Sequence, residues 1–101
     1  MKITKFAKLI GQWLGTVDDG KQLEILAASN NGDVMENAPS PLATVVADEN
    51  EVLYLEIYTE GGALQLPVSD LKELFSSAEG EVHSEEWYEK NVYDAFDNSS
   101  D

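Results

Sequence analysis

The sequence predicts an α+β fold, with an antiparallel sheet of about four strands, one N-terminal helix and two C-terminal helices. Three observations predict it: apolar residues recur at helical spacing near both ends, strand-length apolar runs occupy the middle, and short turn sequences separate those runs. Such an order typically packs helices on one face of the sheet. We expect one α+β domain over residues 1–96 and an acidic, frayed tail at residues 97–101.

The N-terminal segment has the pattern of an amphipathic helix. Apolar side chains recur there at steps of three and four; they are Ile3, Phe6, Ala7, Ile10, Trp13 and Leu14. Thr4 is a suitable N-cap, whereas Gly11 disfavours a helix by about 1 kcal/mol. We therefore predict a helix from residue 3, and residues 11–17 stay open between helix and strand.

Four strands follow, each bounded by turn chemistry. Asp19-Gly20 is a strong hairpin signal, and a strand follows it at Leu23–Ala27. A polar loop covers Ser29 to Pro41. The remaining strands are expected at Leu42–Ala47, Val52–Thr59 and Ala63–Leu66, joined by Asp48-Glu49-Asn50 and by Gly61-Gly62. Such short joins predict antiparallel hairpins.

The run Val52–Tyr58 separates its side chains by type. One face shows Leu53, Leu55 and Ile57, and this aliphatic set is expected in the core. The other face shows Tyr54, Glu56 and Tyr58. That second set forms either the outer face of the sheet or a second packed face.

Two helices are expected in the last third of the chain. The first begins near Val68, with Ser69 or Asp70 as its cap, and ends at Gly80. The second begins near Ser84 and runs to about Phe96. Glu85 and Glu86 fall in its first turn, where carboxylates interact favourably with the helix dipole.

The charge balance excludes several classes of partner. The chain has 20 acidic and six basic residues, a net charge of −14, and every basic residue is a lysine. Residues 1–10 carry +3 and the remainder carries −17. A field of that sign repels phosphates, so we expect no direct binding of nucleic acid or of anionic membranes. It attracts basic proteins, polyamines or metal ions.

The residues of catalysis and metal binding are largely missing. There is no cysteine and a single histidine, His83, which is interpreted as a linker residue or a local cap. No calcium-loop or zinc motif occurs, and the many carboxylates are interpreted as solvated surface. We expect no enzymatic activity, no cofactor and no metal site.

No apolar run is long enough to span a membrane, and no cleavage site follows the N-terminal lysines, so a cytoplasmic protein is expected.

Two acidic, aromatic patches are the candidate partner-binding sites. On the last helix, Tyr93 is expected on the side opposite the core stripe, among carboxylates, which is typical of an interface anchor. On the sheet, Glu56 lies between two tyrosines. The predicted site residues are Glu56, Tyr58, Glu60, Glu85, Glu86, Glu89 and Tyr93. Packing of Tyr93 along the surface is the alternative.

The general character of the chain resembles the small acidic immunity proteins of bacterial toxin systems, including contact-dependent growth inhibition. The stretches that carry the resemblance are Tyr54–Thr59 leading to Leu66-Pro67-Val68, and Glu81–Asn91. The resemblance implies a protein that binds a cognate toxin, often a basic nuclease, and blocks its active site or substrate groove. Two other interpretations stay open: a DNA mimic of the anti-restriction or anti-CRISPR type, and an acidic structural domain without a specific partner. The oligomeric state is not predicted.

Overall fold

The structure is a computed structural model that describes residues 1–18 and 20–93. The chain divides into two compact units, Met1–Leu71 and Lys72–Asp101, which are described separately. The predicted single domain over residues 1–96 stays a prediction, and the acidic tail at 97–101 lies outside the described residues.

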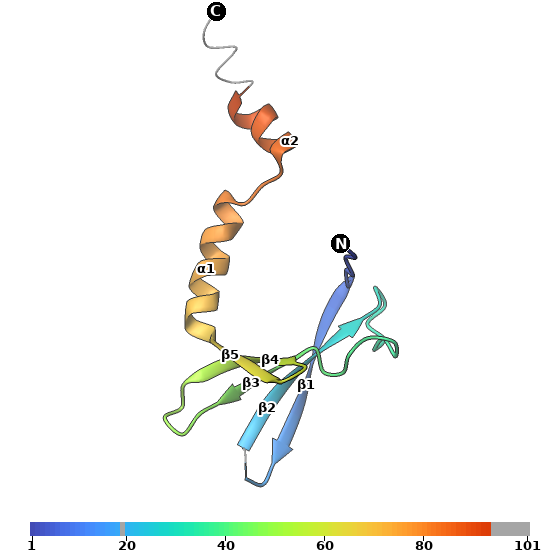
Figure 1. Cartoon of the computed structure of the whole chain (residues 1–101), viewed down its shortest axis with the longest axis vertical. Coiled ribbons are helices and arrows are strands. Elements are labelled where there is room, and N and C mark those ends of the chain that lie inside the picture. Colours follow the sequence, from blue (N-terminus) through green and yellow to red (C-terminus); the bar gives the residue numbers. More distant parts are fainter. Residues whose placement is uncertain (19, 94–101) are drawn as a thin grey trace, which may run out of the picture. The chain divides into compact units, whose positions relative to one another are not determined.

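The described part of the first unit contains a five-stranded antiparallel sheet in the order β1-β2-β3-β4-β5 (Figure 1). Each strand pairs with the next one along the chain. The strands are β1 Lys8–Thr16, β2 Gly20–Ala28, β3 Ala43–Ala47, β4 Leu53–Thr59 and β5 Gly62–Pro67. The turns at Asp19-Gly20 and at Gly61-Gly62 therefore join antiparallel neighbours, as predicted, although Asp19 itself lies outside the described residues.

The predicted N-terminal helix is wrong, because residues 8–16 form the strand β1. The hairpin with β2 pairs all nine residues of β1, from Lys8 opposite Ala28 to Thr16 opposite Gly20. A helix would forgo this ladder and would also accommodate two glycines, each costing about 1 kcal/mol. The helical spacing of the apolar residues arises because they lie on both faces of the strand. The sheet therefore has five strands rather than about four.

Strand register places polar and apolar residues in separate rows across the sheet. The residues of one row are opposite each other on the five strands: Gln12, Glu24, Thr44, Glu56 and Gln65. We call this the polar row, and its side the polar face. The next row along the strands is Trp13, Leu23, Val45, Leu55 and Leu66, which points to the opposite, apolar face. The predicted alternation in β4 is thus confirmed.

Among the described residues, those that are buried lie on β2 and β3. Leu26, Ala27, Ala28, Ala43 and Thr44 are buried. The loop after β2 folds back onto that strand, since the amide of Met35 donates to the carbonyl of Ala27 (3.0 Å). The amide of Leu42 likewise donates to Ile25 (2.9 Å). The expectation that Leu53 belongs to the core is wrong, because its side chain is 48% exposed.

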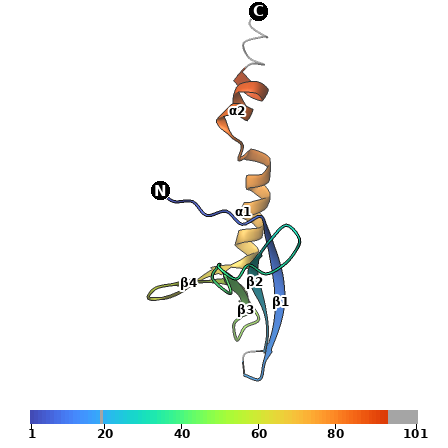
Figure 2. The same ribbon diagram turned by 90° about the vertical axis from the view of Figure 1, so that its right-hand side faces the viewer.

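The helices differ from the prediction at both ends of the chain, since a strand replaces the N-terminal one and the α-helical part of the last one is shorter (Figure 2). Helix α1 spans Val68–Glu81 and continues through Gly80. The short helix α2 spans Glu85–Tyr88, and a π-helical turn, η1, follows at Glu89–Tyr93. Ser84 caps α2 as predicted, because its Oγ accepts from the Trp87 amide (3.1 Å). The prediction of one long helix from Ser84 to about Phe96 is wrong, because α2 ends at Tyr88 and η1 follows. Residues 94–96 lie outside the described part.

A helix crosses a membrane only if it is long and predominantly apolar. Within residues 1–18 and 20–93, the structure has no helix that is both long enough and apolar enough to cross a bilayer.

Candidate partner-binding site

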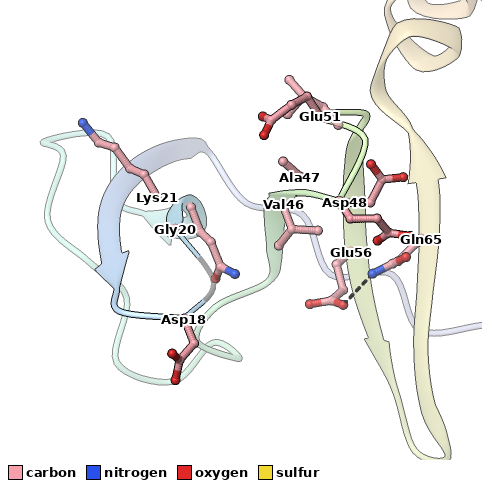
Figure 3. Close-up of a pocket in the computed structure, with 12 residues that line it drawn as sticks. Asp18, Gly20, Lys21, Val46, Ala47, Asp48, Glu51, Glu56 and Gln65 are labelled. Carbon is pink, nitrogen blue, oxygen red and sulfur yellow. Dashed lines mark hydrogen bonds between the residues drawn. The ribbon is translucent and has the colours of Figure 1, made fainter.

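An acidic groove lies in the first unit, beside the polar row of the sheet (Figure 3). Its lining comes from the β1–β2 turn, the β3–β4 turn and the faces of β2, β3, β4 and β5. Five of the twelve lining residues carry carboxylates, namely Asp18, Asp48, Glu49, Glu51 and Glu56. We call these five residues the groove acids.

The fold brings the groove acids together through simple topology. In an antiparallel meander, alternate turns lie at the same end of the sheet. The β1–β2 turn with Asp18 and the β3–β4 turn with Asp48, Glu49 and Glu51 therefore share one end. Glu56 reaches the same groove from β4, between those turns and the middle of the sheet.

Asp48 fixes the β3–β4 turn. Its Oδ1 accepts hydrogen bonds from the amides of Asn50 (2.8 Å) and Val52 (3.0 Å). Its own amide donates to the carbonyl of Val52 (3.0 Å), which closes the turn. Glu51 adopts a left-handed backbone conformation in this turn, with φ of 64°, a conformation that is uncommon for residues other than glycine. The turn thus holds Glu51 in the groove lining at a local conformational cost.

A hydrogen-bond network holds the carboxylate of Glu56 in place. Gln65 Nε2 donates to Glu56 Oε1 and the Tyr58 hydroxyl donates to Glu56 Oε2, both at 3.1 Å. The Tyr58 hydroxyl also lies 2.8 Å from the Thr44 hydroxyl, which is buried. Because the tyrosine proton goes to Glu56, Thr44 donates to Tyr58. Three side chains, one each from β3, β4 and β5, therefore fix the orientation of the Glu56 carboxylate.

The groove acids are not neutralised by the lysine that lies nearby. Lys21 also lines the groove, but its Nζ lies 4.7 Å from the ring centroid of Trp13, a cation–π contact. Figure 3 shows the Lys21 side chain extending away from Asp48 and Glu56. Among the described residues, the ion pair that forms is Lys90–Glu86, in the second unit. The groove therefore presents an uncompensated negative field.

The structure brings together only part of the predicted sheet patch. Glu56 lies in the groove and is hydrogen-bonded to Tyr58, which is half exposed. Glu60 is exposed in the β4–β5 turn, between Thr59 and Gly62. That turn belongs to the opposite end of the meander, so Glu60 is not among the groove residues.

The predicted helix patch lies in the second unit. Glu85, Glu86 and Glu89 are exposed, and Glu86 pairs with Lys90 at 3.3 Å on an open surface, where such a pair contributes little. Tyr93 ends η1, but its side chain lies outside the described part. These residues offer charge without the fixed geometry that the hydrogen bonds give Glu56.

His83 belongs to a small aromatic cluster instead of a site with catalytic geometry. Its ring stacks on Trp87 with centroids 3.8 Å apart and planes 18° apart. Trp87 meets Tyr88 edge to face at 5.0 Å, and Tyr88 donates to the carbonyl of Glu81. The cluster ties the segment before α2 to the helix itself.

Sequence reasoning missed four of the groove acids and Gln65. The sequence indicates Asp18, Asp48 and Glu49 only as turn residues, and nothing in it singles out Glu51. The signal that could have identified them was topological, because consecutive hairpins place these two turns at one end of the sheet. Seeing it requires the N-terminal strand β1, whereas the sequence predicts a helix from residue 3 and leaves residues 11–17 open between helix and strand.

Metal coordination finds no support in the described residues, where no group of three or more His, Asp or Glu side chains is arranged to hold an ion. The expectations of no metal and no cofactor stay predictions.

Comparison of the chain with known protein families, curated proteins and solved structures finds no match.

Proposed function

We propose that this protein binds a basic protein and neutralises it, as an immunity protein neutralises a bacterial toxin. The observation that carries the proposal is the acidic groove, in which five carboxylates gather without an ion pair among the described residues. A basic nuclease is the partner class that fits best, because its substrate site is built to hold phosphates. Carboxylates in the groove would occupy such a site in place of the nucleic acid.

Electrostatics supports capture of such a partner. A cleft lined by one sign of charge concentrates field lines and raises the association rate with an oppositely charged partner. Steered association reaches about 10⁸–10⁹ M⁻¹s⁻¹ at low salt, against about 10⁵–10⁶ M⁻¹s⁻¹ without steering. The net charge of −14 extends the same field around the molecule. Fast capture suits a protein that must reach a toxin before the toxin reaches nucleic acid.

Preorganisation supports specificity. Each oxygen of Glu56 accepts one hydrogen bond within the sheet, and an ionised carboxylate has about four acceptor sites. Capacity therefore remains for a lysine or a bidentate arginine of the partner. Because Tyr58 and Gln65 already fix the carboxylate, binding loses little side-chain entropy there.

The test is affinity capture from a lysate of the source organism, with its toxins present as inactive mutants and elution by a salt gradient. Three immobilised proteins are compared. The first is the wild type, and the second is a groove variant with Asp18→Asn, Glu49→Gln, Glu51→Gln and Glu56→Gln. The third is a charge-matched control that changes four exposed acids elsewhere to glutamine: Glu36, Glu73, Glu79 and Glu81. Both variants lose the same number of charges, so only the position of the charge differs.

We expect the wild type and the control to retain one basic protein at moderate salt, and the groove variant to lose it. Equal loss by both variants would show that total charge, not the groove, binds the partner. Several nucleic-acid-binding proteins that elute together and compete with DNA would favour the DNA mimic. A further variant, Glu85→Gln with Glu86→Gln and Glu89→Gln, tests the helix patch, and loss of capture there alone would move the site to the second unit.

A further inference from the structure

β1 is an edge strand with few of the features that usually protect such an edge. In the part of the chain that the structure describes, β1 pairs with β2 alone, so its outer edge carries unpaired backbone groups. Its pairing with β2 runs without a bulge over nine residues. Residues 9–16 contain no charge and no proline, in a chain of which 26% is charged. Long, uncharged edges are templates for pairing with a further strand.

The other edge of the sheet is different. β5 has six residues and ends in Pro67, which lacks a backbone N–H and so limits strand addition. Pro67 is followed at once by α1. Of the two edges, β1 is therefore the one suited to accept another strand.

We propose that β1 pairs with β1 of a second copy, antiparallel, with Gln12 of one copy opposite Gln12 of the other. The residues of β1 are complementary to themselves in this register. Gly11 lies opposite Trp13 and Leu9 opposite Gly15, so that each large side chain on the apolar face meets a glycine. On the polar face, Ile10 lies opposite Leu14. A register centred on Gly11 would place two glycines opposite each other, and a register centred on Trp13 would place two tryptophans opposite each other.

The exposed side chains of β1 agree with this arrangement. Leu9 is 56% and Trp13 is 66% exposed, and both lie on the apolar face. Antiparallel pairing would cover part of both with the neighbouring strand, and each good cross-strand pair contributes about 0.2–1 kcal/mol. Because the proposed dimer is two-fold symmetric, every cross-strand pair other than Gln12–Gln12 occurs twice.

Charge complementarity is confined to the two ends of β1, where it opposes the general repulsion between two chains of net charge −14 and fits a second copy in this register. Lys8 begins β1, and the turn that carries Asp18 follows its other end. In the antiparallel pair, Lys8 lies opposite Thr16 of the second copy, with that copy's Asp18 turn next along the strand. The positive N-terminal segment of each copy thus meets the acidic turn of the other, at both ends of the interface. No residue of β1 lines the groove, although Asp18 of the adjoining turn does. The mass and cross-linking measurements below use the protein alone and therefore do not depend on the proposed function.

The first experiment measures molecular mass by sedimentation equilibrium over a range of protein concentrations. We expect the wild type to approach twice 11.1 kDa. Leu14→Lys places a charge opposite Ile10 of the second copy and should weaken the dimer at least about tenfold. The matched control is Leu64→Lys on β5, which should leave the dimer unchanged. Circular dichroism checks that both variants are folded.

A monomeric wild type at millimolar concentration would overturn the proposal. So would a dimer that survives Leu14→Lys and is lost with Leu64→Lys, because that result would assign the interface to β5. Large aggregates without a defined dimer would also contradict it.

The second experiment tests the register by disulfide cross-linking, which is clean because the chain has no cysteine. Gln12→Cys places two thiols opposite each other and should give a covalent dimer under mild oxidation. Ile10→Cys, on the same strand and face, should not. Its two copies lie four residues apart along the strand, about 14 Å, whereas a disulfide needs Cα atoms within about 7 Å. Cross-linking by Ile10→Cys but not by Gln12→Cys would overturn the register.

Discussion

The buried Thr44 hydroxyl depends on one partner on the polar face. Thr44 is only 2% exposed, and its Oγ1 lies 2.8 Å from the Tyr58 hydroxyl. Tyr58→Phe removes that partner and leaves the hydroxyl buried. We expect a loss of about 1–3 kcal/mol in the free energy of unfolding, measured by urea denaturation.

Two controls separate this effect from loss of a phenol in general. Tyr54→Phe, on the same strand and face, should change stability little. Adding Thr44→Val to Tyr58→Phe removes both partners and should recover part of the loss, since apolar replacement of a whole pair is nearly neutral. A double variant less stable than Tyr58→Phe alone would contradict the network.

The substitution Glu51→Gly distinguishes an effect on partner binding from an effect on stability. Its φ of 64° favours glycine, which has no Cβ to clash in that conformation. We expect Glu51→Gly to leave the free energy of unfolding unchanged or to raise it by up to about 1 kcal/mol, because the strain relieved exceeds the entropy gained by the unfolded chain. The same change removes a groove carboxylate and should slow association with the basic partner. A stability loss above about 1 kcal/mol would contradict the description of this turn.

At the scale of elements, the β1–β2 hairpin contains two glycines with different surroundings. A Cβ on Gly11 would lie 2.9 Å from Leu23 Cδ1, whereas a Cβ on Gly15 would meet nothing within 4 Å. We expect Gly11→Ala to lower the free energy of unfolding by about 1 kcal/mol as Leu23 shifts. Gly15→Ala should be neutral or slightly stabilising. Thermal unfolding at low protein concentration compares the two, and equal effects would contradict the packing of Leu23 over Gly11.

The same hairpin shows what the sequence could and could not predict. The strands in residues 42–66 were predictable because alternation and short turns act locally, within one hairpin at a time. β1 was not, because its apolar residues match helical spacing and only pairing with β2 decides between the two structures. Tertiary pairing therefore overrode the local pattern. The final helix was overextended for a similar reason, since periodicity alone does not specify where α2 gives way to η1.

At the scale of the whole molecule, the candidate site depends on topology more than on any local motif. Glu56 and Tyr58 were predictable from the alternation of β4. Asp18 and Glu51 come from turns that are 33 residues apart in the chain, and they share a groove only because the strands form a meander. Glu60 belongs to the same predicted patch as Glu56 and Tyr58, yet its turn lies at the other end of the sheet.

The proposed function requires that the groove acids, and not the net charge, capture a basic partner. The association rate with the captured protein, measured at increasing ionic strength, distinguishes these two sources of attraction. The measurement compares the wild type, the groove variant and the charge-matched control. Salt screens exposed charges, with a Debye length of about 8 Å at physiological ionic strength.

We expect the association rate of the wild type to fall steeply with salt and that of the control to fall almost in parallel. The groove variant should associate more slowly and depend less on salt. Identical rates and slopes for the two variants would contradict this expectation. The electrostatic field of the whole molecule would then be sufficient to explain the association rate, and the groove acids would have no special role in capture.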